Sequence, residues 1–230
     1  MPDYTLAELA KMFDHSLLQP TLTDADLDRG FQVAREYQVA SVCVKPYAVA
    51  RAAAALRGSG VLVGTVIGFP HGGHLSTIKA AEAEAAMADG AVELDMVVNV
   101  GKVLSGDWRY VRDDIAAVID PAHRNGAKVK VIFENCFLAD EQKIELCRIS
   151  GELRADWVKT STGYGESGAT DHDLTLMRKH SPPHVQVKAA GGVRTCDRVL
   201  AVRALGVTRI GATATKAILD DCRQRLGDGK

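Results

Sequence analysis

Eight short apolar segments alternate with amphipathic helical patterns along the chain, and this alternation predicts a single (β/α)8 barrel, a TIM barrel, over residues 1–230. The apolar segments are rich in β-branched residues, as expected of parallel strands that are covered on both faces. Nothing in the composition marks a linker between domains. An open doubly wound sheet is the alternative, but no Gly-x-Gly-x-x-Gly turn follows an early strand to bind a dinucleotide.

The first half of the chain supplies four strand–helix units. Thr5 and Glu8 have capping-box spacing and predict a short N-terminal helix to about residue 12, which we expect to close one end of the barrel. The expected strands are residues 13–18, 39–44, 61–69 and 91–98. The expected helices are residues 27–37 with a cap at Thr23, 46–56 with Pro46 in the first turn, one capped near Ser76 that ends at Gly90, and 107–124.

The second half repeats the same unit four more times. The expected strands are residues 128–133, 156–158, 185–188 and 207–210. The expected helices are residues 140–149, one capped at Thr170 to Asp173, 195–205 with Gly206 as its stop, and 214–226. In such a barrel the catalytic groups lie at the carboxyl ends of the strands.

Composition and charge exclude several classes of protein. A hydrophobic content of 47% and a charged content of 25% are typical of an ordinary soluble α/β domain. The 28 basic and 29 acidic residues are spread without long runs, which disfavours nucleic acid and anionic membranes as partners. The first residues show no basic region followed by an apolar core, and no run approaches the ~18 apolar residues of a membrane span. We therefore expect a cytoplasmic protein.

Neither the cysteines nor the histidines suggest a metal site or a disulfide framework. The five cysteines are scattered and form no Cys-x-x-Cys, which fits a reducing compartment. His71 and His74, with His15, are the best metal candidates, but histidines beside a glycine loop more often line a substrate site. The expectation is a site without a metal.

Two lysines leave buried strands at similar places. Lys159 ends the strand at 156–158 and leads into a hydroxyl- and glycine-rich loop; Lys188 ends the strand at 185–188 and leads into glycines. Desolvation lowers the pKa of an ammonium, and a second cation nearby lowers it further, which frees an amine for attack on a carbonyl. Lys159 is the candidate nucleophile. The alternative is that both are ordinary strand-end lysines in solvent.

A carboxylate is expected at the same rim. Asp95 lies among apolar residues in its strand, where an unpaired charge is costly, so we expect it to face the two lysines. It either takes part in the chemistry or only neutralises a buried lysine. The other polar or thiol groups at strand ends are Asp14, Cys43, Lys45 and Glu134.

Two glycine-containing turns are candidates for an anion site. Residues 191–194 (Gly-Gly-Val-Arg) and 211–213 (Gly-Ala-Thr) lead into helix N-termini, where backbone N–H groups and the helix dipole favour a phosphate. Barrel enzymes often bind phosphate after these last strands. The alternative is that the glycines serve only the turns.

The chain resembles the deoxyribose-phosphate aldolases, which are class I aldolases with a (β/α)8 barrel. The likeness spans nearly the whole chain through motifs that are highly specific when taken in order. These are Phe13-Asp-His, Ser41-Val-Cys-Val, Val66-Ile-Gly-Phe-Pro, Glu93-Leu-Asp-Met-Val, Trp157-Val-Lys-Thr-Ser-Thr-Gly, Val187-Lys-Ala-Ala-Gly-Gly-Val-Arg and Arg209-Ile-Gly.

The resemblance implies a reaction and a role for each matching residue. It implies reversible cleavage of 2-deoxy-D-ribose 5-phosphate to acetaldehyde and D-glyceraldehyde 3-phosphate, with no metal or other cofactor. Lys159 is then the Schiff-base lysine, Lys188 the neighbour that lowers its pKa, Asp95 the proton-relay carboxylate and Asp14 a further relay carboxylate. The implied substrate- and phosphate-binding residues are Cys43, Thr160, Gly163, Gly191, Gly192, Arg194, Gly211 and Thr213.

Some positions depart from the family pattern. Lys45 stands where Asn is common, and Gln19 where Lys is frequent. Thr213 keeps a hydroxyl in the phosphate turn, but Thr215 replaces a common glycine, and the tail at 226–230 has no tyrosine. Two other functions therefore stay open: Schiff-base chemistry on a different or unphosphorylated aldehyde, and a non-catalytic barrel that binds a sugar phosphate. The family often forms homodimers, so a homodimer is a further expectation.

Overall fold

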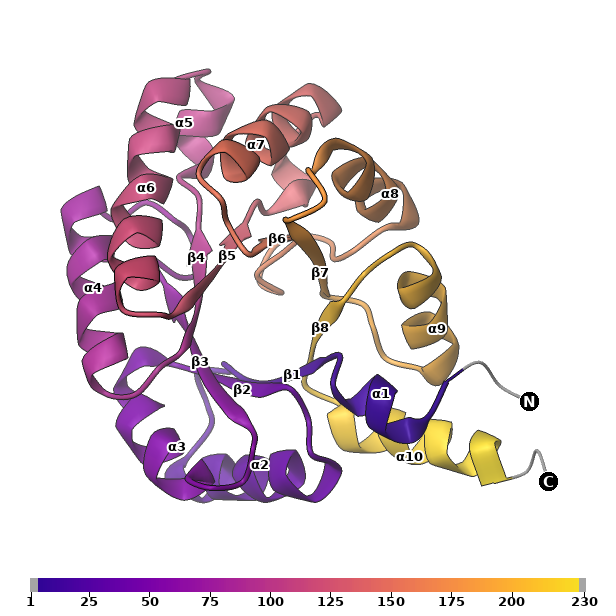
Figure 1. Cartoon of the computed structure of the whole chain (residues 1–230). Coiled ribbons are helices and arrows are strands. Elements are labelled where there is room, and N and C mark those ends of the chain that lie inside the picture. Colours follow the sequence, from indigo (N-terminus) through magenta and orange to yellow (C-terminus); the bar gives the residue numbers. More distant parts are fainter. Residues whose placement is uncertain (1–3, 228–230) are drawn as a thin grey trace.

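The computed structural model describes residues 4–227 and forms a closed barrel of parallel strands, in which each strand pairs with the next and β8 pairs with β1 (Figure 1). The strands are β1 (Phe13–Leu17), β2 (Ser41–Val44), β3 (Leu62–Ile67), β4 (Glu93–Val97), β5 (Lys128–Ile132), β6 (Trp157–Lys159), β7 (Gln186–Ala190) and β8 (Arg209–Ala212). The predicted (β/α)8 barrel is confirmed, and the open doubly wound sheet is excluded.

Helices form the outer ring around the strands (Figure 1). The α-helices are α1 (Leu6–Ala10), α2 (Asp24–Tyr37), α3 (Val49–Leu56), α4 (Ser76–Ala88), α5 (Val100–Leu104), α6 (Trp108–Arg124), α7 (Asp140–Glu152), α8 (Asp171–His180), α9 (Cys196–Ala204) and α10 (Thr215–Gly227). Two 3-10 turns, η1 (Pro46–Ala48) and η2 (Asn135–Phe137), follow β2 and β5. None of the helices within residues 4–227 is long and apolar enough to cross a membrane.

Most helix starts agree with their predicted caps. The capping boxes at Thr5 and Thr23 are formed, and Thr170 Oγ1 accepts from the Asp173 amide at 3.1 Å. The cap predicted near Ser76 is wrong. The Ser76 hydroxyl instead donates to Asp114 on α6 at 2.7 Å. Leu75 precedes the helix, and no side chain caps it. The Ser76 hydroxyl therefore joins α4 to α6 instead of capping α4.

Three local features differ from the sequence prediction. The short helix α5 was not predicted; it begins after Asn99, whose side chain accepts from the Lys102 amide, and it contains Gly101, which weakens a helical pattern. Pro46 starts a 3-10 turn rather than the α-helix itself. The N-terminal helix α1 packs against α10 beside the junction of β1 and β8, rather than across the barrel opening (Figure 1).

A disulfide joins α9 to α10 through Cys196 and Cys222, which lie 26 residues apart. The sequence predicted no disulfide framework, because nothing in the spacing of the cysteines shows that these two helices are neighbours. Cys43, Cys136 and Cys147 are free thiols. The expectation that the cysteines form no disulfide is therefore wrong for Cys196 and Cys222.

Candidate active site

The register of β6 and β7 brings the two predicted lysines together. Lys159 is the Cα partner of Lys188 in this pair of parallel strands, so both side chains leave the same layer of the barrel. Each is almost fully buried, with 3% and 1% of its surface exposed. The interpretation of ordinary strand-end lysines in solvent is therefore wrong.

Asp95, at the centre of β4, accepts hydrogen bonds from three lysines. Its Oδ2 lies 2.7 Å from Nζ of Lys159 and 2.7 Å from Nζ of Lys188. Its Oδ1 lies 2.9 Å from Nζ of Lys130, which the β4–β5 register places directly opposite. The predicted meeting of Asp95 with the two lysines is confirmed, and Lys130 is a third cation that the sequence analysis did not single out.

A second layer of charges surrounds this group. Asp14 Oδ2 lies 2.6 Å from Nζ of Lys188, and Glu93 Oε2 lies 2.7 Å from Nζ of Lys130. Arg209 pairs with both Asp14 and Glu93. Within residues 4–227, the connected cluster thus holds four cations (Lys130, Lys159, Lys188 and Arg209) and three carboxylates (Asp14, Glu93 and Asp95), so it has one positive charge too many when every group is ionised.

The pKa values show which cation gives up that charge. Burial lowers the pKa of Lys159, and Lys188 lowers it further against the opposing pull of Asp95. Burial also acts on Lys188 and Lys130, but their carboxylate partners outweigh it and raise both pKa values. The same lysines hold the pKa of Asp95 well below its usual range despite its burial. Lys159 is therefore the lysine of this cluster that releases its proton most readily.

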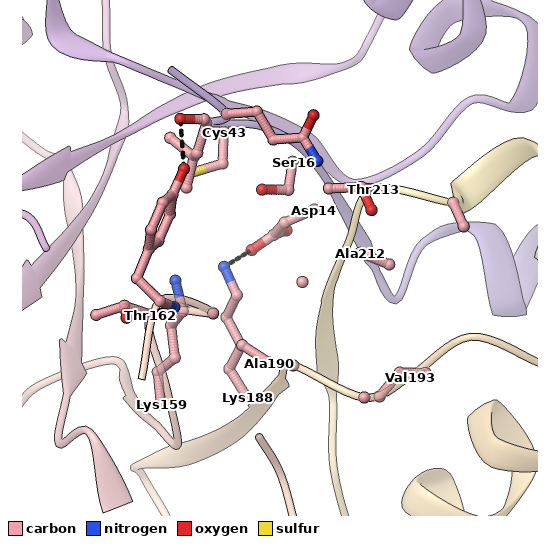
Figure 2. A pocket seen from close by; sticks show the side chains of 18 of the residues that line it. Asp14, Ser16, Cys43, Lys159, Thr162, Lys188, Ala190, Val193, Ala212 and Thr213 are labelled. Atoms are coloured by element: carbon pink, nitrogen blue, oxygen red, sulfur yellow. Dashed lines mark hydrogen bonds and ion pairs between the residues drawn. The ribbon is translucent and has the colours of Figure 1, made fainter. Parts of the chain in front are cut away.

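A cavity of about 500 Å³ opens above this cluster at the carboxyl ends of the strands. Lys159 and Lys188 point into it from one wall, and Asp14 and Ser16 line the wall opposite (Figure 2). Asp95 is fully buried beneath the cavity. The predicted site residues that line the cavity are Asp14, Cys43, Lys159, Gly163, Lys188, Gly191, Gly192, Arg194, Gly211 and Thr213.

One end of the cavity has the features of an anion site. Gly191 and Gly192 line this end and have φ angles of 77° and 85°, a backbone conformation that favours glycine. A Cβ on Gly211 would lie 3.5 Å from Cε of Lys188, so the absence of a side chain keeps this end open beside the lysine. Thr213 and Arg194 supply a hydroxyl and a cation at the rim. Backbone amides, a hydroxyl and a guanidinium are the donors that a phosphate prefers.

Several predicted residues have other roles. The Thr160 hydroxyl donates to the Ala190 carbonyl at 3.1 Å and joins β6 to β7 outside the cavity. Lys45 donates to the backbone carbonyl of Gln19 at 2.8 Å. Glu134 binds the amide and hydroxyl of Thr162. The predicted substrate contact at Thr160 is therefore replaced by a structural one, because the side chain points between strands.

Thr215 faces away from the cavity. Its hydroxyl donates to the Ala212 carbonyl at 3.1 Å and lies 2.9 Å from Nδ1 of His15, so Nδ1 carries the proton in this pair. Burial lowers the pKa of His15 to about 4, which keeps the imidazole neutral. The described part of the chain contains no group of three His, Cys, Asp or Glu side chains placed to hold a metal.

Four residues of this site were not predicted from the sequence. Lys130 and Glu93 face the barrel interior in the middle of their strands, and only the strict alternation with Val129 and Val131 signals the orientation of Lys130. Arg209 belongs to the Arg209-Ile-Gly motif, but nothing in the sequence indicates that its side chain joins the charge cluster. Tyr164 lines the cavity from the β6–α8 loop, and its hydroxyl donates to the Leu18 carbonyl at 3.0 Å.

Comparisons with known proteins agree with this geometry. The model of the DeoC/LacD family aldolases matches residues 8–218. The chain is 58% identical to a deoxyribose-phosphate aldolase of Rhodopirellula baltica, with 99% of this chain and 94% of that protein covered. It is 45% identical to one of Clostridium perfringens, with 96% and 97% covered.

Solved structures give the same result. The aldolase QR15 superposes with a TM-score of 0.90 at 30% identity, covering 97% of this chain and 99% of that chain. The tetrameric deoxyribose-phosphate aldolase of Aeropyrum pernix superposes with a TM-score of 0.89 at 28% identity, covering 96% and 93%. The resemblance inferred from the motifs is confirmed: the chain belongs to the DeoC/LacD family of aldolases.

Proposed function

We propose that the protein is a class I aldolase that reversibly cleaves 2-deoxy-D-ribose 5-phosphate to acetaldehyde and D-glyceraldehyde 3-phosphate through a Schiff base on Lys159. The observation that carries this proposal is the buried Lys159, the lysine of the charge cluster whose pKa is lowered, which faces a cavity with an anion site at its other end. The names of the relatives support the same substrate.

The first step is formation of the imine. The lone pair of neutral Lys159 attacks C1 of the open-chain sugar, and a new C–N bond forms while the carbonyl oxygen takes up a proton. Loss of that oxygen as water leaves an iminium ion. The carboxylate of Asp95, 2.7 Å from Nζ, stabilises this cation as it stabilised the ammonium.

The second step breaks the bond between C2 and C3. The C3 hydroxyl loses its proton, the C2–C3 electron pair moves toward the iminium nitrogen, and glyceraldehyde 3-phosphate leaves with a new carbonyl at C3. Protonation of the remaining enamine at C2 and addition of water to the iminium release acetaldehyde and the free lysine. Lys188, which points into the cavity and bonds to both Asp95 and Asp14, is the proposed proton relay: its ammonium passes a proton to Asp95 as it takes the proton of the C3 hydroxyl, and the same path returns a proton to C2 of the enamine.

The anion end of the cavity orients the substrate for this step. We assign the phosphate to the backbone of Gly191, Gly192 and Gly211 with the side chains of Thr213 and Arg194, all of which line the cavity. Binding energy from the phosphate then holds the reacting carbons near Lys159, and this raises the rate of the chemical step.

The two alternative functions have less support. Thr215, which with Thr213 is the reason to consider an unphosphorylated substrate, bonds to His15 and Ala212 away from the cavity, so its bulk does not narrow the anion end. A barrel that only binds a sugar phosphate has no need of a buried lysine with a lowered pKa, because such a group costs stability.

Trapping of the imine tests the proposal. The protein is reduced with borohydride in the presence of 2-deoxyribose 5-phosphate, with unphosphorylated deoxyribose in a parallel sample, and peptides are analysed by mass spectrometry. We expect an adduct confined to Lys159 and much stronger with the phosphate. Equal labelling by both sugars supports the altered-substrate function, and a folded protein without any adduct overturns the Schiff-base mechanism.

Location and assembly are further proposals. We propose that the protein acts in the cytoplasm, which the three free thiols support and the single Cys196–Cys222 bridge opposes. We also propose a homodimer; the Aeropyrum pernix relative is a tetramer, so a larger assembly is the competing outcome. Light scattering coupled to size-exclusion chromatography separates these masses.

A further inference from the structure

A single tyrosine bridges two loops over the mouth of the cavity. Tyr164 belongs to the loop between β6 and α8, and its hydroxyl donates to the backbone carbonyl of Leu18, just after β1, at 3.0 Å. Both residues line the cavity. The phenol therefore spans from the strand that carries Lys159 to the strand that carries Asp14.

The loop that carries Tyr164 is fixed on both sides. Before Tyr164, the amide and hydroxyl of Thr162 bond to Glu134, and Thr162 Oγ1 in turn accepts from the Tyr164 amide at 3.0 Å. After Tyr164, Gly168 touches Gly191 so closely that a Cβ on Gly168 would lie 2.4 Å from the Gly191 carbonyl carbon. The backbone is thus fixed on both sides of Tyr164, and the half-exposed phenol is held by its own hydrogen bond to Leu18.

The space beside Tyr164 is apolar. Leu18, Cys43 and Val66 form a small hydrophobic cluster apart from the main core, and Phe69 packs on it. The ring of Tyr164 meets Phe69 edge to face, with 5.5 Å between the ring centroids. Burial raises the pKa of the Cys43 thiol to about 11, so this side chain is also uncharged.

The cavity therefore has two chemically different ends. In Figure 2, Cys43 and Lys159 lie at one end, whereas Val193 and Thr213 lie at the other, where the anion site is. A sugar joined to Lys159 through C1 and anchored by its phosphate at the far end leaves its two-carbon donor fragment beside the apolar end.

We propose that Tyr164 is a specificity-determining residue: its phenol, held by the Leu18 carbonyl and Phe69, closes the apolar end and limits the donor aldehyde to two carbons. This inference rests on the proposed function and names the residue that sets the size of the donor aldehyde. A longer donor places additional methylene groups against the ring, which cannot retreat without breaking its bond to Leu18.

The test compares imine trapping by aldehydes of increasing length. Acetaldehyde, propanal and butanal are each reduced onto the protein with borohydride, and the rate of each Lys159 adduct is followed by mass spectrometry. We expect Tyr164→Ala to raise the ratio of propanal to acetaldehyde labelling about tenfold or more, the usual effect of one methylene in a fitted pocket. Tyr164→Phe keeps the ring and loses one hydrogen bond, so we expect a rise of roughly threefold.

Tyr47→Ala is the matched control, since Tyr47 is 66% exposed and does not line the cavity. We expect its ratio of propanal to acetaldehyde labelling to equal that of the unsubstituted protein. A ratio within twofold of the reference in folded Tyr164→Ala overturns the role of Tyr164. If that variant does not fold, Tyr164→Phe and Tyr164→Leu decide by the same ratio. Failure of acetaldehyde to label Lys159 in the reference protein instead overturns the proposed function itself.

Discussion

Lys159 and Lys188 donate to the same oxygen atom: each Nζ lies 2.7 Å from Oδ2 of Asp95. Two ammonium groups this close to one another repel, and only Lys188 has a second carboxylate, Asp14, to compensate. The shared oxygen thus divides the lysines into one that keeps its proton and one that releases it.

Removal of Lys159 abolishes the chemistry but spares the fold. We expect Lys159→Met to lose all borohydride-trapped adduct and to lower kcat by at least about a thousandfold, since the covalent route is gone. The variant removes the surplus charge from the cluster, so its free energy of unfolding stays within about 1 kcal/mol of the reference. Urea unfolding followed by circular dichroism measures this difference.

Lys130→Met is the contrasting variant. Lys130 lies 2.7 Å from Glu93, 2.9 Å from Asp95 and 3.3 Å from Asp14, so its loss deprives three buried carboxylates of a shared cation. We expect a loss of about 3–5 kcal/mol in the free energy of unfolding. Equal stability of the Lys159→Met and Lys130→Met proteins contradicts the proposed distribution of charge.

The pH dependence of imine formation follows from Lys159. Its native pKa lies below that of the unfolded chain, so the trapping rate at fixed aldehyde concentration rises as the pH increases through the native value. Lys188→Met removes a neighbouring cation, and we therefore expect the rise to move to higher pH. A profile in Lys188→Met that is unshifted, or shifted to lower pH, contradicts the role assigned to Lys188.

Stability gives a second measure of the same pKa. Between the lowered native pKa of Lys159 and about 10.4, the unfolded chain binds the extra proton, so the free energy of unfolding rises with pH in this window. Lys159→Met lacks this contribution. We expect the stability of the reference protein relative to this variant to increase with pH, as measured by urea unfolding at several pH values; a decrease contradicts the direction of the shift.

A substitution that keeps the shape of the Thr213 side chain tests the anion end of the cavity. Thr213→Val replaces the hydroxyl with a methyl group, and a lost hydrogen bond to a charged phosphate is worth about 1.5–3 kcal/mol. We expect KM for 2-deoxyribose 5-phosphate to rise about tenfold to a hundredfold, with the unphosphorylated sugar unaffected. Thr215→Val is the control, because Thr215 faces His15 outside the cavity. Equal effects on both sugars contradict a phosphate contact at Thr213.

The sequence predicted the strands, the barrel and the convergence of Lys159, Lys188 and Asp95, because strand ends of a barrel meet at one face and apolar periodicity marks each strand. It did not predict which residues in the middle of the strands face inward together. Lys130 meets Asp95 through the β4–β5 register, and register depends on pairing between distant segments.

Contacts between loops could not be predicted from the sequence either. Tyr164 and Leu18 are separated by 146 positions, and nothing in either segment signals that a hydroxyl of one meets a carbonyl of the other. Thr160 shows the opposite error: a hydroxyl in a motif-rich loop suggests a ligand contact, but the side chain is fully buried and joins two strands. Side-chain direction at the end of a strand decides such cases, and it follows from packing.

The contact between Gly168 and Gly191 also limits how the enzyme can be redesigned. Gly168 ends the loop that holds Tyr164, and Gly191 begins the turn assigned to the phosphate, with a hypothetical Cβ on Gly191 only 2.8 Å from the Gly168 Cα. A side chain at either position displaces both loops at once, so donor and acceptor preference would change together. Libraries that aim to alter one preference alone should keep this glycine pair and vary residues farther along each loop.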